Sequence, residues 1–194
     1  MFADISGFVA LARTLGAEKT VTLLNTIVRR FDELAQVHGV EKIKTIGDAY
    51  MAAAGIPIAR ADHMLALANM ALDMLSAAKV ISEQSGIAIN IRIGMASGPM
   101  MAGVIGTKKF SYDVWGDPVN LASRLESASA PGRVLVCPDC YRALAANFTF
   151  ESRGMIDIKG VGQREAWFLT GRRSASDGSS VMPLSPSNAA RTAV

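Results

Sequence analysis

The sequence predicts an α+β domain in which one sheet carries helices mainly on one face. Two observations lead to this expectation. Segments with helical spacing of apolar residues alternate with short β-like segments, and several of the latter come in pairs around tight turns. Such hairpins argue against a doubly wound parallel sheet, in which a helix separates successive strands. Half of the 194 residues are hydrophobic (50%), which is enough for the core of one domain of ordinary size.

The first expected elements are a strand and two helices. Residues 2–5 have the pattern of a strand end, so we expect the strand to be truncated in this sequence. Ser6-Gly7 turns the chain into a helix, and a longer helix follows Gly16 and ends at Gly39. The apolar stripe of the longer helix consists of Val21, Leu24, Ile27, Val28, Phe31 and Leu34.

A hairpin and a third helix come next. Residues 40–46 and 50–54 are expected to pair around a tight turn at Gly47-Asp48. The helix that follows runs to about Ser85, and Asn69 and Asp73 interrupt its apolar run, which favours a core helix over a membrane span. Its expected apolar face consists of Met64, Leu67, Ala71, Leu75 and Ala78.

The second half alternates between strands and short helices. Isoleucines at every second position predict a strand over residues 87–93, followed by a glycine-rich loop at 96–106. Residues 110–115 have the pattern of another strand, and Asp117-Pro118 is expected to open a helix as its N-cap and first residue. The remaining expected elements are a strand at 134–136, a helix at 138–146 and a closing hairpin of residues 148–158 and 165–169.

Composition excludes some functions. The net charge is only +3, far from the concentrated positive charge of a nucleic-acid binder, so no nucleic-acid partner is expected. Two cysteines indicate no disulfide framework and favour a cytoplasmic domain. Cys137 and Cys140 are interpreted as packed thiols, with a redox or metal role as the alternative. Residues 173–194 are rich in serine and proline and are expected to be a flexible tail after a domain of residues 1–172.

Two aspartates occupy positions where a cation could bind. Asp4 ends the first strand, and the turn Ser6-Gly7 after it places free backbone N–H groups at a helix N-terminus, where phosphate is favoured. Asp48 stands at a hairpin tip. Each could instead be an ordinary solvated cap or turn residue. If both carboxylates meet on adjacent strands, they suit Mg²⁺ beside substrate phosphates.

Other polar residues could bind a nucleotide. Asn120 and Arg124 are four residues apart on a helix and share a face, which suits ribose and phosphate. The alternative is a polar outer face on which Arg124 and Glu126 are solvated. Lys159 is followed by Gly160 and could reach phosphate or only water.

Five motifs in this order, FADISGF, EKIKTIGDAYM, IRIGMASGPMMAGVIG, YDVWGDPVNLASR and DIKGVG, resemble the class III nucleotidyl cyclase catalytic domain. The resemblance implies a palm-like (ferredoxin-like) βαββαβ core with a mostly antiparallel sheet, helices packed on it and a C-terminal hairpin extension. It also implies a head-to-tail homodimer with two equivalent sites at its interface. Relatives are fused to membrane segments or sensor domains, so the parent protein could carry either.

The resemblance assigns metal and catalytic roles residue by residue. Asp4, Asp48 and the backbone carbonyl of Ile5 would bind Mg²⁺ or Mn²⁺, two ions in each site. Asn120 would orient the ribose, and Arg124 would stabilise the transition state.

Substrate recognition is assigned in the same way. Lys44 and Asp113 would read the base, Arg92 and Lys159 would hold the terminal phosphates, and Gly7-Phe8 would lie against the substrate. In the family geometry, the metal half and the base half of one site come from different chains. Lys44 and Asp48 of one chain would therefore serve two different sites.

The residue pair that reads the base favours ATP. Adenine offers a donor at N6 and an acceptor at N1, which match a carboxylate at Asp113 and an ammonium at Lys44. Guanine reverses both groups, and related guanylyl cyclases carry Glu where Lys44 stands. The expected reaction is in-line attack of the ATP 3′-hydroxyl on the α-phosphate, giving 3′,5′-cyclic AMP and pyrophosphate. The alternatives are a guanylyl or mixed-specificity cyclase, and a non-catalytic nucleotide-binding regulatory domain.

Overall fold

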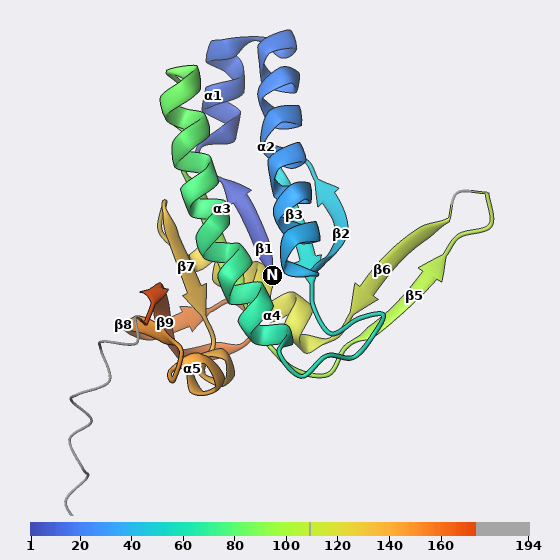
Figure 1. Cartoon of the computed structure of the whole chain (residues 1–194), viewed down its shortest axis with the longest axis vertical. Helices are drawn as coiled ribbons and strands as arrows, with labels where there is room; N and C mark the ends of the chain where they lie inside the picture. The colour runs from blue at the N-terminus through green and yellow to red at the C-terminus, as the bar shows by residue number, and fades with distance from the viewer. Residues whose placement is uncertain (109, 174–194) are drawn as a thin grey trace, which may run out of the picture.

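The computed structural model describes residues 1–108 and 110–173 and contains a seven-stranded sheet with a separate two-stranded arm (Figure 1). The strands of the sheet are β1 (Phe2–Ile5), β2 (Glu41–Ile46), β3 (Ala49–Ala53), β4 (Ile91–Met95), β7 (Arg133–Val136), β8 (Phe148–Ile158) and β9 (Gly162–Arg172). Their order is β2-β3-β1-β4-β7-β9-β8, and only the β4–β7 pair is parallel. The predicted mostly antiparallel sheet, with the order β2-β3-β1-β4 of a βαββαβ core, is confirmed.

The helices cover the two faces of this sheet unequally. They are α1 (Phe8–Leu15), α2 (Ala17–His38), α3 (His63–Ser85), α4 (Asp117–Ala128) and α5 (Pro138–Leu144). Phe31 of α2 packs edge-on against Tyr50 of β3, with ring centroids 5.6 Å apart. On the opposite face, the backbone of α4 lies so close to Gly94 of β4 that a Cβ there would be 2.1 Å from the Glu126 backbone nitrogen. Alternation along β1 and β4 therefore turns Asp4 and Arg92 toward α4.

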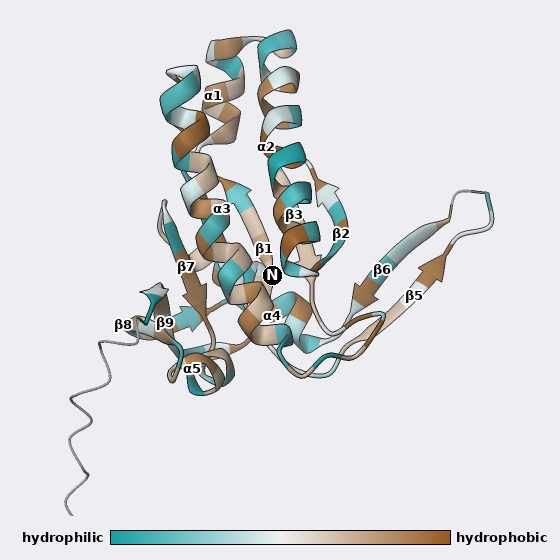
Figure 2. Cartoon of the chain, in the orientation of Figure 1, coloured by the Kyte–Doolittle hydropathy of each residue, from teal (hydrophilic) through white to brown (hydrophobic). Residues whose placement is uncertain are grey.

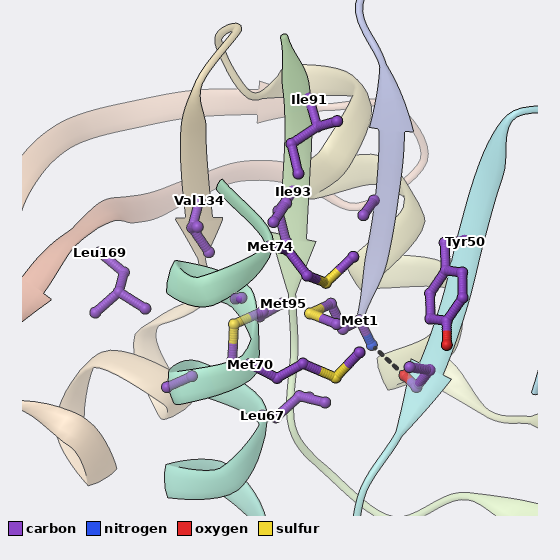
Figure 3. Close-up of a cluster of buried hydrophobic side chains, with 14 of the residues drawn as sticks. Met1, Tyr50, Leu67, Met70, Met74, Ile91, Ile93, Met95, Val134 and Leu169 are labelled. Carbon is purple, nitrogen blue, oxygen red and sulfur yellow. Dashed lines mark hydrogen bonds between the residues drawn. The ribbon is translucent and has the colours of Figure 1, made fainter. Parts of the chain in front are cut away.

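The hydrophobic core lies between the sheet and α3. Met70 and Met74 of α3 are fully buried together with Ile91 and Ile93 of β4, as Figure 3 shows. By length and composition α3 could also cross a membrane, but half of its most apolar stretch is buried within this fold. The prediction of a core helix at this place is confirmed.

The start of β4 and the cap of α4 differ from the prediction. The strand predicted over residues 87–93 begins only at Ile91. Before it, the Ser82 hydroxyl donates to the Ile87 carbonyl and accepts from the Ile89 N–H, so this segment is held by α3 and not by the sheet. The N-cap of α4 is Gly116 and not Asp117, and the proline lies one residue further into the helix than predicted.

The glycine-rich segment predicted as a loop contains a strand. β5 (Met101–Ile105) pairs with β6 (Ser111–Trp115), and this arm projects from the body of the molecule (Figure 1). Most β5 residues are exposed, so the segment lacks the alternating burial that marks a half-buried strand. Figure 2 shows hydrophobic colour on both strands of the arm. Its large exposed apolar side chains are Met101, Val104, Ile105 and Phe110.

Helix α2 shows a smaller difference. Val21, predicted in its apolar stripe, is 66% exposed, whereas Thr20 and Leu23 are buried. The stripe begins one residue away from the predicted position, because α1 packs against the first turns of α2. The predicted tail lies outside the described residues from 174 onward, and the division of the chain at residue 172 stays a prediction.

Candidate active site

Two carboxylates meet where β1 ends beside the β2–β3 turn. β1 pairs with β3, with Ala3 opposite Tyr50, and this register brings Asp48 next to Asp4. The two side chains are close enough for the Asp4 carboxylate to act on the charge of Asp48. Burial and then the neighbouring Asp4 raise the pKa of Asp48 to about 6, against opposing hydrogen bonds from backbone N–H groups of Asp48 and Ile5. The condition that the two carboxylates come together is therefore met, with Asp4 on β1 and Asp48 in the β2–β3 turn.

This pair suits a divalent cation. Carboxylate oxygens are the hard ligands that Mg²⁺ and Mn²⁺ prefer, and Mg²⁺ usually takes only one or two protein carboxylates beside substrate phosphates. Over residues 1–108 and 110–173 no group of three or more His, Cys, Asp and Glu side chains could hold a metal, so the pair is not part of a larger protein cage. A cation between Asp4 and Asp48 would relieve the repulsion from Asp4, which adds to the effect of burial on the pKa of Asp48. Participation of the Ile5 carbonyl stays a prediction.

Replacing Asp48 by asparagine is expected to raise the melting temperature of the metal-free protein at neutral and higher pH. The folded state raises the pKa of Asp48 from 3.8 to about 6, so wild-type stability falls as pH rises through this window, while the variant avoids that loss. Thermal unfolding in a chelator across the window measures the difference, which should shrink at the acidic end. Asp139→Asn, at an exposed carboxylate, is the control. If the difference in melting temperature between Asp48→Asn and wild type did not depend on pH, the raised pKa of Asp48 would be wrong.

Arg92 lies between two carboxylates of the same face. Its Nη2 donates to Asp4 Oδ2 at 2.8 Å and lies 3.1 Å from Glu126 Oε1. Glu126 was considered for a solvated outer face of α4, but it is only 7% exposed, and that alternative is wrong. The sequence signal that could have located it is its spacing from Ala122, since residues four apart share a face and Ala122 is buried.

Lys44 and Asp113 form an ion pair within one chain. Lys44 Nζ donates to Asp113 Oδ2 at 2.5 Å, and the Val114 N–H donates to Asp113 Oδ1 at 2.9 Å. The Lys44 ammonium is the main reason that the pKa of Asp113 is lowered. The structure thus brings together the two residues predicted to read the base, one from the edge of the sheet and one from the arm.

A bulge in β2 determines the direction of Lys44. Lys42 lies opposite Ala52, while Lys44 lies opposite Met51, so the two lysines point to opposite faces despite being two residues apart. Lys42 accordingly bonds Asp32 of α2 at 2.7 Å. Without the bulge, strand alternation would put both lysines on one face.

An apolar cavity of about 320 Å³ lies beside this pair. Its wall includes Met51, the cross-strand partner of Lys44, and Val114 and Val119, the chain neighbours of Asp113 and Asn120. Sequence reasoning did not identify these residues, because valine and methionine carry no signal that distinguishes a cavity wall from core. Cys140 also lines the cavity. Its sulfur atom is 3.5 Å from the sulfur atom of Cys137, and both cysteines are buried.

The remaining predicted residues lie around α4 and α1. Asn120 is exposed on α4. The Arg124 guanidinium extends to the β8–β9 turn and lies so close to Gly160 that a Cβ added there would be 3.1 Å from Arg124 Nη1. The same turn carries Lys159, which is exposed. Gly7-Phe8 forms the start of α1, where Gly7 is an N-cap without a side-chain hydrogen bond, so the first N–H groups are not capped by a side chain.

No hydrogen bond or ion pair in the described part of the chain joins the Asp4–Asp48 pair to the Lys44–Asp113 pair. Each group of site residues is formed separately within the chain. Which nucleotide parts each would contact stays a prediction for every residue named above.

Comparison with known proteins identifies the family. The sequence model of the adenylate and guanylate cyclase catalytic domain matches residues 1–171. An adenylate cyclase of Mycobacterium tuberculosis is 42% identical over 189 residues, covering 97% of this chain and 43% of the relative. The human guanylate cyclase soluble subunit beta-2 is 38% identical over 179 residues, 91% of this chain and 29% of the relative. The chain thus spans less than half the length of these relatives.

Solved structures give the same result. The adenylyl cyclase CyaB from P. aeruginosa superposes with a TM-score of 0.85 at 29% identity, covering 89% of this chain and 92% of that one. The guanylate cyclase domain of RhGC from Catenaria anguillulae, in complex with GTP, also reaches 0.85, at 34% identity and with coverage of 89% and 94%. Adenylyl and guanylyl cyclases both match. The chain belongs to the class III adenylyl and guanylyl cyclase catalytic-domain family.

Proposed function

We propose that this domain is an adenylyl cyclase that converts ATP to 3′,5′-cyclic AMP and pyrophosphate. The observation that carries the proposal is the Lys44–Asp113 pair, because its donor and acceptor match the Watson–Crick edge of adenine and oppose that of guanine. Mispairing buried polar groups costs roughly 1–3 kcal/mol each, so two mismatches are enough for a strong preference. The 42% identical mycobacterial relative named an adenylate cyclase supports the same choice.

The proposed mechanism assigns one task to each group. Asp113 accepts from adenine N6 and Lys44 donates to N1, which orients the nucleotide. Asn120 holds the ribose so that its 3′-oxygen faces the α-phosphorus, and Arg124 meets the charge that develops there during displacement. Arg92 and Lys159 hold the terminal phosphates, which leave as pyrophosphate. Two Mg²⁺ or Mn²⁺ ions at Asp4 and Asp48 would supply charge neutralisation and a more acidic 3′-hydroxyl when bound.

A head-to-tail homodimer with two equivalent sites is part of the proposal. The arm exposes Met101, Val104, Ile105 and Phe110, which range from 59% to 75% exposure, and a second copy would cover such a surface. Since one chain carries both groups of site residues, two identical chains can build two sites about a two-fold axis.

We also propose that the domain works in the cytoplasm, within a parent protein that could carry membrane or sensor segments. The chain covers only 11% of the membrane guanylyl cyclase of Dictyostelium discoideum, to which it is 38% identical. A guanylyl cyclase is the second candidate function, because guanylyl relatives match at 38–40% identity.

An assay with equal concentrations of ATP and GTP, repeated over a wide range of protein concentration, tests substrate and dimer together. We expect cyclic AMP as the main product and a turnover per chain that falls as dilution dissociates the dimer. Cyclic GTP as the main product would favour the second candidate. A turnover per chain that stays constant far below the dimer dissociation constant would contradict the shared sites.

A further inference from the structure

Two buried polar atoms next to the carboxylate pair have no hydrogen-bond partner in the described part of the chain. They are Arg92 Nε and Glu126 Oε1. The residues already touch, because Arg92 Nη2 lies 3.1 Å from the same Glu126 oxygen, although not in the orientation of a hydrogen bond. Buried polar atoms are almost always paired, so two unpaired atoms that could satisfy each other indicate a second arrangement of these side chains.

The hydrogen bond of the Arg92 guanidinium goes to Asp4, while its contact with Glu126 is an ion pair without hydrogen-bond geometry. Arg92 Nη2 donates to Asp4 Oδ2 at 2.8 Å, and the β1–β4 register fixes this contact by placing the two residues directly opposite each other. Glu126 is fixed as well, because the α4 backbone rests on Gly94 of β4. The guanidinium therefore lies between the carboxylate proposed to bind a cation and a buried carboxylate that has no part in binding it.

We propose that Arg92 occupies two positions and that Glu126 is the positioning residue for the second. In one, the position seen in this structure, Arg92 donates to Asp4. When a divalent cation binds Asp4, the guanidinium turns to Glu126 and donates from Nε and Nη2 to its two oxygens, which satisfies both unpaired atoms. This inference rests on the proposed function, because it assigns the cation to Asp4 and Asp48.

Glu126 would then set the affinity of the site for cations without touching them. Arg92 competes with the cation for Asp4, and the carboxylate of Glu126 lowers the free energy of the position in which Arg92 has released Asp4. In Glu126→Gln, Arg92 keeps Asp4 as its only anionic partner, so a cation must displace it at greater cost. In Arg92→Gln the competitor is absent, and the charge of Glu126 should hardly matter.

A double-mutant cycle tests this arrangement with Mn²⁺ alone, without nucleotide. Mn²⁺ affinity is taken from the rise in melting temperature with Mn²⁺ concentration for wild type, Glu126→Gln, Arg92→Gln and the double variant. We expect Glu126→Gln to weaken Mn²⁺ binding on the order of tenfold in the wild-type background and to have little effect in the Arg92→Gln background. Glu33→Gln, which removes an exposed carboxylate paired with Arg30, is the matched control and should change nothing.

Three outcomes overturn the inference. The first is that Glu126→Gln weakens Mn²⁺ binding equally in both backgrounds, which would mean that Glu126 acts only through its charge and not through Arg92. The second is that Glu126→Gln does not weaken Mn²⁺ binding in the wild-type background, and the third is that the wild-type melting temperature does not respond to Mn²⁺. If Glu126→Gln does not fold, Arg92→Lys is used in its place. Lysine keeps the positive charge near Asp4 but lacks the two parallel N–H donors that would bond the Glu126 carboxylate. Weaker Mn²⁺ binding is expected there, and unchanged binding overturns the inference. Coupling without any cyclic nucleotide formation would contradict the proposed function alone, and turnover without coupling would contradict only the inference.

Discussion

Asp48→Ala is expected to reduce cyclic nucleotide formation at least about a thousandfold while the domain stays folded, since cations at a reacting phosphate supply several kcal/mol of transition-state stabilisation. Asp48 sits in a turn with an unfavourable carboxylate neighbour, so its removal relieves repulsion in the empty protein. Steady-state turnover with Mn²⁺, together with circular dichroism and a melting curve, separates loss of activity from loss of fold.

Asp139→Ala is the matched control for this change, because it removes an aspartate whose carboxylate is 64% exposed on α5 and pairs with the exposed Arg142. It should keep wild-type turnover. If Asp48→Ala retained more than a small fraction of the activity, the carboxylate pair could not be the cation site.

The second large effect is expected on the choice of base. Lys44→Glu combined with Asp113→Cys should raise the ratio of GTP to ATP turnover by at least about a hundredfold, because two mispaired contacts become two matched ones. Glutamate can accept from guanine N1, and the thiol can donate to O6. Both residues must change together, because Lys44→Glu alone would place a carboxylate against Asp113, which Lys44 now contacts at 2.5 Å.

Lys42→Glu controls for a charge reversal on the same strand. Lys42 lies two residues away but points to the opposite face, where it bonds Asp32. It should lower stability through that lost ion pair and leave the ratio of GTP to ATP turnover unchanged. If the Lys44→Glu, Asp113→Cys variant kept the wild-type ratio, the proposed basis of recognition would be wrong even though the domain is a cyclase.

Most of the fold could be predicted from local patterns. Periodic apolar residues located α2 and α3, Gly39 marked the end of α2, and the β2–β3 and β8–β9 hairpins followed from alternation and turn residues. These features depend on residues close in sequence, which is why the chain alone reveals them. The failures occur where the apolar pattern of a segment does not match its structure: residues 87–90 alternate without being a strand, and β5 is a strand without alternating burial. The strand start at Ile91 depends on a hydroxyl from α3, and β5 depends on a partner strand beyond a turn.

The candidate site divides in the same way. The resemblance of five ordered motifs to the cyclase family was enough to name Asp4, Asp48, Lys44 and Asp113, because each position carries the residue type that the family uses there. Only the folded chain showed that Asp4 meets Asp48 and that Lys44 meets Asp113, since strand register and the bulge in β2 decide the face to which each side chain points.

Glu126 and Arg92 are the clearest case of what the tertiary structure alone decided. In the sequence, Glu126 is one more charged residue on an amphipathic helix. In the fold it is buried against Arg92, because Gly94 lets the backbone of α4 approach β4 closely. The sequence by itself determined which chemical groups are available. Burial and partners, which set their charges and contacts, arise from elements far apart in the chain, and only packing brings these together.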